Sequence, residues 1–233
     1  MHYASLKERG HTLNIVRRTQ QSWLPEAESF GAVQSDYVPG LGLSLFQLAV
    51  REIDDRVSAR PGDLIAGLAW LAGRVAQGIA LRDNLSGVAM EQAANGVLFL
   101  RSDRVSGLLA SLETGSLAAA LFDAALLSGS RRFPDLHAVR RDAMEDLERR
   151  GECNYRDMSL SASAENLAAM LQSDVESLLF DQDDRIMLFN ALTAACAHAI
   201  GYGRHKTEPA LAAELALSVA FHAGWIDQRK SMR

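Results

Sequence analysis

Five side chains that could bind a metal ion lie near the C-terminal end of the 233-residue chain. They are Cys196, His198, His205, Glu214 and His222. Neutral imidazole nitrogens, a thiolate and a carboxylate are all ligands of zinc and similar ions. No HxxxH or HExxH pair places two of them on one helical turn. We therefore assign no metal and no cofactor, and keep His198, His205 and His222 as the candidates for a ligand or metal site.

Two acidic groups have the spacing of carboxylates that hold Mg²⁺ against a phosphate. Glu52 and Asp55 are three residues apart in REIDDR, and Asp181 and Asp184 are three residues apart in FDQDDR. Arginines flank both groups, and ordinary solvated ion pairs are the alternative interpretation. The acidic groups leave both possibilities open.

Arg132 and His137 are five residues apart, and this spacing resembles the RxxxxH pair of HEPN-type helical ribonucleases. The resemblance implies two side chains that face one catalytic pocket. Pro134 lies between them and favours a helix start at that point. Six arginines face five acidic residues between positions 131 and 150, which is typical of a solvated helix face.

Glu91 and Asn95 are four residues apart in the segment GVAMEQAANGVLFL. We expect this segment to be a helix, on which the two polar side chains share one face. They would lie on the solvent side of the helix, or would line a polar pocket or an interface.

The spacing of apolar residues predicts an all-α fold, a single-domain bundle of roughly eight to ten helices. Strand-like alternation is almost absent, and Ala and Leu dominate the chain. Eight stretches are expected to be helical: 46–57, 61–82, 102–115, 116–128, 135–150, a stretch through Leu167 to Leu179, 184–200 and 207–223. Ser102 and Thr207 are the expected N-caps of two of them.

The first forty residues differ from the rest of the chain. Trp23, Phe30, Tyr37 and Val38 are spaced irregularly among Gly, Pro and Ser. We expect residues 1–40 to be an N-terminal arm or wrapping segment and residues 41–233 to be the helical domain.

Composition and charge exclude some partners. The net charge of -5 disfavours binding to nucleic acid or to an acidic membrane surface. The uncharged stretch Ile186–Gly203 is weakly apolar, and we interpret it as a buried core helix. Two cysteines without a CxxC motif, together with an N-terminus that lacks an apolar signal region, predict a cytoplasmic protein.

We expect a non-catalytic protein-binding or self-associating module. A two-fold homodimer is the simplest assembly, with the aromatic segment Trp23–Val38 contributing to the contact, and a separate protein partner is compatible with the same pattern. The alternative is a small-ligand or metal-binding enzyme with a site built from His198, His205 and His222. The sequence leaves open whether the protein is an enzyme.

Overall fold

A computed structural model describes residues 30–54, 61–82, 88–93, 95–149, 154–155, 158–159, 167–169, 171–172 and 182–226. Of these residues, 76% are helical, and a short two-stranded sheet is also present. The expectation of a mainly helical protein is confirmed.

The described residues form a succession of helices that two short hairpins interrupt. The helices are α2 (Phe30–Asp54), α3 (Pro61–Arg82), α4 (Asp103–Ala110), α5 (Leu117–Leu127), α6 (Leu136–Arg149), α8 (Gln182–Gly203) and α9 (Pro209–Trp225). The strands are β1 (Val88–Gln92), β2 (Leu98–Ser102), β3 (Asn154–Tyr155) and β4 (Met158–Ser159), paired antiparallel as β1–β2 and β3–β4.

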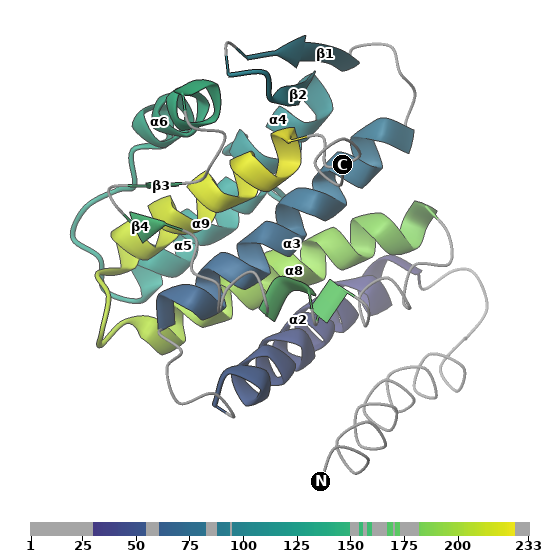
Figure 1. Cartoon of the computed structure of the whole chain (residues 1–233). Coiled ribbons are helices and arrows are strands. Elements are labelled where there is room, and N and C mark those ends of the chain that lie inside the picture. Colours follow the sequence, from purple (N-terminus) through teal and green to yellow (C-terminus); the bar gives the residue numbers. More distant parts are fainter. Residues whose placement is uncertain are drawn as a thin grey trace, which may run out of the picture.

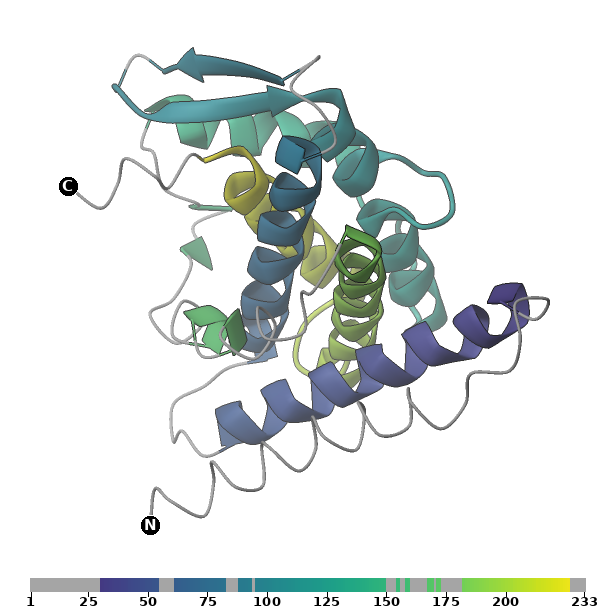
Figure 2. The same ribbon diagram turned by 90° about the vertical axis from the view of Figure 1, so that its right-hand side faces the viewer.

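Helix α3 lies between α9 and α8, and α2 lies across α8 (Figures 1 and 2). Helices α5 and α6 pack against α9 on its other side. Every residue of α9 from Ala212 to Trp225 is buried, which explains its nearly continuous run of small and apolar side chains. A helix that is apolar on all sides belongs in the interior of a bundle.

Glycine allows α3 and α9 to approach closely. A Cβ atom at Gly73 would overlap the carbonyl group of Ala220 in α9. Gly224 makes the reciprocal approach from α9, because a Cβ there would lie 3.3 Å from the carbonyl oxygen of Gly73. Glycine costs about 1 kcal/mol relative to alanine within a helix, and here close packing offsets that cost.

Helix α2 corrects the boundary expected at residue 40. Residues 30–40 are helical, and the helix continues without a break to Asp54. The prediction of an irregular segment is therefore wrong for residues 30–40. Proline lacks an N–H donor and normally ends a helix, yet α2 runs through Pro39. The packing of Leu41, Leu45 and Ala49 in the core holds the helix together beyond it. Trp23 lies outside the described residues.

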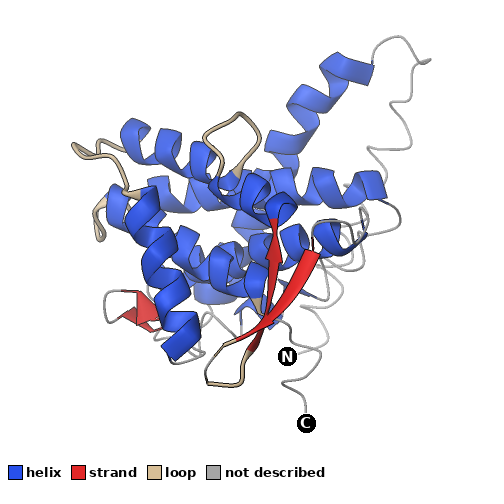
Figure 3. Ribbon diagram, turned by 90° about the horizontal axis from the view of Figure 1, so that it is seen from above, coloured by secondary structure: helices blue, strands red, loops and turns tan. Residues whose placement is uncertain are grey.

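The segment expected to place Glu91 and Asn95 on a helix forms the β1–β2 hairpin instead. Figure 3 looks down on this hairpin where it lies over the helices. Gly96 has φ +86°, a conformation that glycine adopts readily and that turns the chain back on itself. The Ala93 N–H donates to the Val97 carbonyl across the turn at 2.9 Å. Turn chemistry therefore overrides the helical propensity of the alanines around it.

The helix starts follow capping rules. The Ser102 hydroxyl accepts from the N–H of Val105, as expected, and Ser116 caps α5 in the same way. The expectation for Thr207 is wrong, because the Glu208 carboxylate caps α9 instead. Helix α4 ends at Ala110, before the expected end at Gly115.

Among the residues that the structure describes, two helices are long and apolar enough to cross a membrane by length and composition alone. They are Gly62–Arg82 and Arg185–Gly203, and 78% and 56% of their apolar windows are buried within the protein. Both helices pack against other helices of the fold.

Candidate functional site

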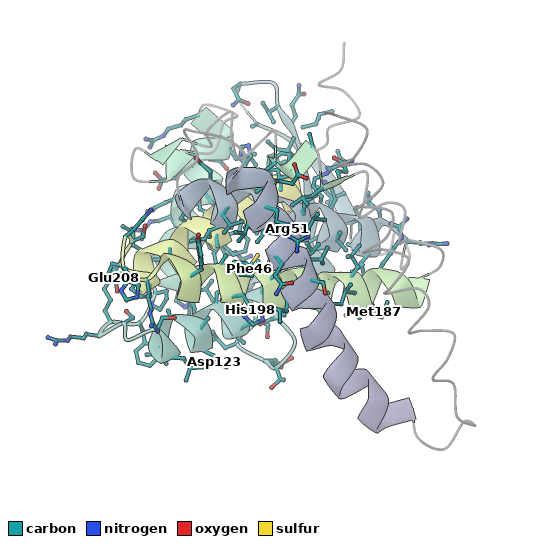
Figure 4. The ribbon with its side chains drawn as sticks, turned by 90° about the horizontal axis from the view of Figure 1, so that it is seen from below. Phe46, Arg51, Asp123, Met187, His198 and Glu208 are labelled. Atoms are coloured by element: carbon teal, nitrogen blue, oxygen red, sulfur yellow. The ribbon has the colours of Figure 1, made fainter. Side chains whose placement is uncertain are left out.

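The three candidate histidines have three different sets of neighbours. His198 is exposed on α8, and its ring centroid lies 5.9 Å from that of Phe46 on α2 (Figure 4). The Phe46 ring also packs edge-on against Tyr202 at 5.7 Å. His205 lies in the turn after α8, where its Nε2 accepts a hydrogen bond from Arg204 Nε at 3.2 Å.

His222 is buried on α9, with its ring centroid 6.4 Å from that of Trp70 on α3. Burial lowers the pKa of His222 to about 4, since a charged imidazolium would lose its hydration there. Its buried Nδ1 has no hydrogen-bond partner within the described part of the chain. The ring is therefore neutral at pH 7.

Cys196 lies wholly within the core, and burial raises the pKa of its thiol to about 12. A thiol that stays protonated is a poor metal ligand and a poor nucleophile. No group of three or more His, Cys, Asp or Glu side chains that could hold a metal ion occurs among the described residues. The histidine site stays a prediction, and the packing of the described residues adds no support for it.

Glu214, a candidate metal ligand by residue type, is paired with an arginine. This fully buried carboxylate on α9 receives a hydrogen bond from Arg132 Nη2 to its Oε2 at 3.0 Å. Its Oε1 accepts from the backbone N–H of Asp135 at 3.2 Å. A carboxylate in the interior requires such partners, because an unpaired buried charge is strongly unfavourable. The pair joins the segment between α5 and α6 to the core.

A second carboxylate extends this network at the start of α9. Glu208 accepts from Arg132 Nε at 3.4 Å and from the Ser130 hydroxyl at 2.7 Å, while capping the N–H of Leu211 at 2.8 Å. Partial burial works to raise the pKa of Glu208, but the hydrogen bonds from Ser130 and from backbone N–H groups outweigh it and hold that pKa below its usual value. Two carboxylates and one guanidinium thus fix the chain between Ser130 and Asp135.

That fixed segment forms one wall of a groove beside α5, called here the α5–α6 groove. It has a volume of about 800 Å³. It is lined by Leu112, Thr114, Gly115, Ala119, Ala120, Phe122, Asp123, Leu126, Phe133, Pro134, Asp135, Leu136 and His137. Phe133 is 69% exposed and Leu112 is 66% exposed. Exposed large apolar side chains that lie close together are typical of binding surfaces.

The sequence analysis did not predict that Asp123 and Asp135 line a groove, or that Arg132 joins an ion-pair network. The mixture of charges between positions 131 and 150 predicted a solvated helix face for Arg132. In the structure Arg132 binds two carboxylates more than seventy residues away. His137 lines the groove, and Arg132 does not, so the two residues of the RxxxxH spacing have different surroundings. The sequence does contain a local indication of the groove, because the apolar residues Leu126, Leu127 and Phe133 lie on either side of a glycine turn.

The structure describes few side chains of the two acidic groups, Glu52 with Asp55 and Asp181 with Asp184. Glu52 is half-buried on α2. Asp55 and Asp181 lie outside the described residues. A pairing of the two groups on facing helices stays a prediction.

No family model matches the chain, and no curated protein or solved structure is significantly similar to it.

Proposed function

We propose that the protein is a non-catalytic, self-associating helical module that binds a second copy of itself through the α5–α6 groove. The observation that carries this proposal is the set of apolar side chains that the groove holds at the surface. Leu112, Leu126 and Phe133 are all exposed, and neighbouring Leu127 is 88% exposed. Their removal from water by a partner would stabilise a complex by about 25 cal/mol for each Å² of apolar surface.

The rigidity of the groove supports a binding role over a chance apolar patch. The buried Glu214 and the partly exposed Glu208 both bind Arg132, and Arg132 directly precedes Phe133. Asp135 is held twice, since its N–H binds Glu214 and its carboxylate accepts from the N–H of Ala138 at 2.9 Å. A preorganised surface loses less conformational entropy when it binds.

We further propose that the helices form a single-domain bundle. One continuous cluster of buried apolar residues includes members from α2, α3, α4, α5, α6, α8 and α9. A shared core of this kind is the usual mark of one domain. A two-fold dimer of such domains is the most common assembly of a self-associating protein.

Light scattering and sedimentation at micromolar concentration test the function. The wild-type chain should have twice the 25.4 kDa mass of one copy. Phe133→Asp should shift the equilibrium toward the monomer, because a carboxylate would be desolvated in the contact. Met90→Asp is the matched control, since Met90 is also exposed but lies on the β1–β2 hairpin. A monomeric wild-type chain, or a Phe133→Asp dimer as stable as the control, would contradict the proposal.

A further inference from the structure

We propose that the α5–α6 groove binds the basic N-terminal stretch, residues 1–20, of a second copy. This inference rests on the proposed function and names the segment that the groove receives. The contact would be reciprocal, so that each copy contributes one segment and one groove.

The groove combines apolar walls with negative charge. Asp123 and Asp135 both line it, and neither Lys nor Arg is among its lining residues. Asp123 is exposed on α5, and none of the described residues forms an ion pair with it. A fitting partner therefore carries apolar side chains together with at least one positive charge, because complementary charge selects the partner and its orientation.

Residues 1–20 have this chemistry. They contain four basic residues, Lys7, Arg9, Arg17 and Arg18, and one acidic residue, Glu8, which sum to +3. Since the whole chain has a net charge of -5, the remaining residues sum to -8. Apolar residues alternate with the charges at Leu6, Leu13, Ile15 and Val16. The stretch is thus opposite in charge to the rest of the protein.

The N-terminal end of α2 projects beyond the rest of the fold. Figures 2 and 4 show the N-terminal part of α2 running out past the other helices. In Figure 4 it leaves toward the lower right, whereas Asp123 lies to the left of α2. Figure 2 shows this end of α2 on the same side of the bundle as α5, so the charge-swap experiment below, and not the direction of α2, distinguishes the groove of the same copy from that of a second copy. The 11 residues between Arg18 and Phe30 can span at most roughly 40 Å, at about 3.3 Å per residue, so a groove that receives Arg17 and Arg18 has to lie within that distance of the start of α2.

A charge swap in the full chain tests the pairing. One variant carries Arg17→Glu and Arg18→Glu, and the other carries Asp123→Arg. Each variant alone places like charges together in both reciprocal contacts, and its dimer dissociation constant should rise about tenfold relative to wild type. Mixed in equal amounts, the two variants should form a heterodimer of near wild-type affinity, because each of its two contacts again joins opposite charges.

Two matched controls change the same charges elsewhere. Arg140→Glu and Glu148→Arg alter exposed residues of α6 and should leave the dissociation constant unchanged. Far-UV circular dichroism of every variant verifies that it is folded.

The outcomes separate this inference from the proposed function. Charge variants that dimerise like wild type, while Phe133→Asp does not, would overturn the N-terminal docking and leave groove-mediated self-association standing. The N-terminal docking would also be overturned if the two weakened variants did not regain wild-type affinity when mixed. If the N-terminal stretch docked into the groove of its own copy, the mass of every charge variant would stay unchanged, and this result too would overturn the inference. A monomeric wild-type chain would overturn both proposals.

Discussion

The guanidinium of Arg132 lies 3.0 Å from Oε2 of Glu214, a carboxylate with no exposed surface, although the two residues are 82 positions apart. Arg132 itself is 45% exposed, so one partner of the pair has access to water and the other has none. This asymmetry determines how the pair responds to mutation.

Arg132→Ala should destabilise the protein more than Glu214→Gln. The first change removes the Arg132 guanidinium from a buried carboxylate and should lower the free energy of unfolding by about 3 kcal/mol. The second leaves an arginine that water can solvate and should cost about 1 to 2 kcal/mol. Urea denaturation measures both. Arg131→Ala, at the exposed neighbouring arginine, should change stability by less than about 0.5 kcal/mol, and equal costs for the two test variants would contradict the explanation.

Stability should fall in mild acid because of His222. Its pKa is about 4 in the folded protein and 6.5 in the ordinary, unfolded state. Between these values the unfolded chain binds a proton that the folded protein does not, so the free energy of unfolding rises with pH across this window and levels off above it. The total change is about 3 kcal/mol.

A His222→Gln variant isolates this effect, because glutamine does not titrate while the carboxylates of both proteins do. The difference in unfolding free energy between wild type and the variant, measured by urea denaturation from pH 4 to pH 7, should grow in favour of wild type as pH rises. A difference that stays constant over this range would show that the histidine is not buried in its neutral form.

Alanine should have opposite effects at two helical glycines. Gly73→Ala places a methyl group against the Ala220 carbonyl and should cost about 1 to 3 kcal/mol by overpacking the contact between α3 and α9. Gly107→Ala, on the exposed face of α4 with open space around it, should stabilise the protein by up to about 1 kcal/mol. Thermal unfolding distinguishes them by the sign of the shift in melting temperature. A stabilised Gly73→Ala protein would refute the close helix crossing.

Asn95 should contribute to stability while Glu91 should not. The Asn95 amide donates to the Leu147 carbonyl of α6 at 3.0 Å, and Asn95→Ala should cost about 1 kcal/mol. Glu91 pairs with Arg101 at the exposed surface at 3.4 Å, and Glu91→Ala should cost less than about 0.5 kcal/mol. Guanidinium denaturation of the two variants tests this. If the order were reversed, the hairpin would not be anchored through its turn.

Local sequence was sufficient to predict an element where its secondary structure depends on one short stretch of chain. The apolar stripe of 61–82 and the serine before 103 correctly predict α3 and the start of α4, since helix period and capping depend on residues a few positions apart. The same local rules failed at 88–102, where a glycine with positive φ forms a hairpin whose inner strand buries Phe99 and Leu100. They also failed at Pro39, because core packing of the later turns holds α2 together.

The sequence by itself determined the helical class and the position of most helices. Only the tertiary structure decided which charges meet. Arg132 lies among six arginines that all have acidic residues nearby in sequence, and nothing local distinguishes it from the others. Its partners Glu208 and Glu214 come from a helix more than seventy residues away, brought there by the packing of α5, α6 and α9. The α5–α6 groove differs in this respect, because all its lining residues lie between positions 112 and 137 and its apolar residues are therefore close in sequence. Only the packing on α9 decides how the chain from Ser130 to Asp135 is held beside α5.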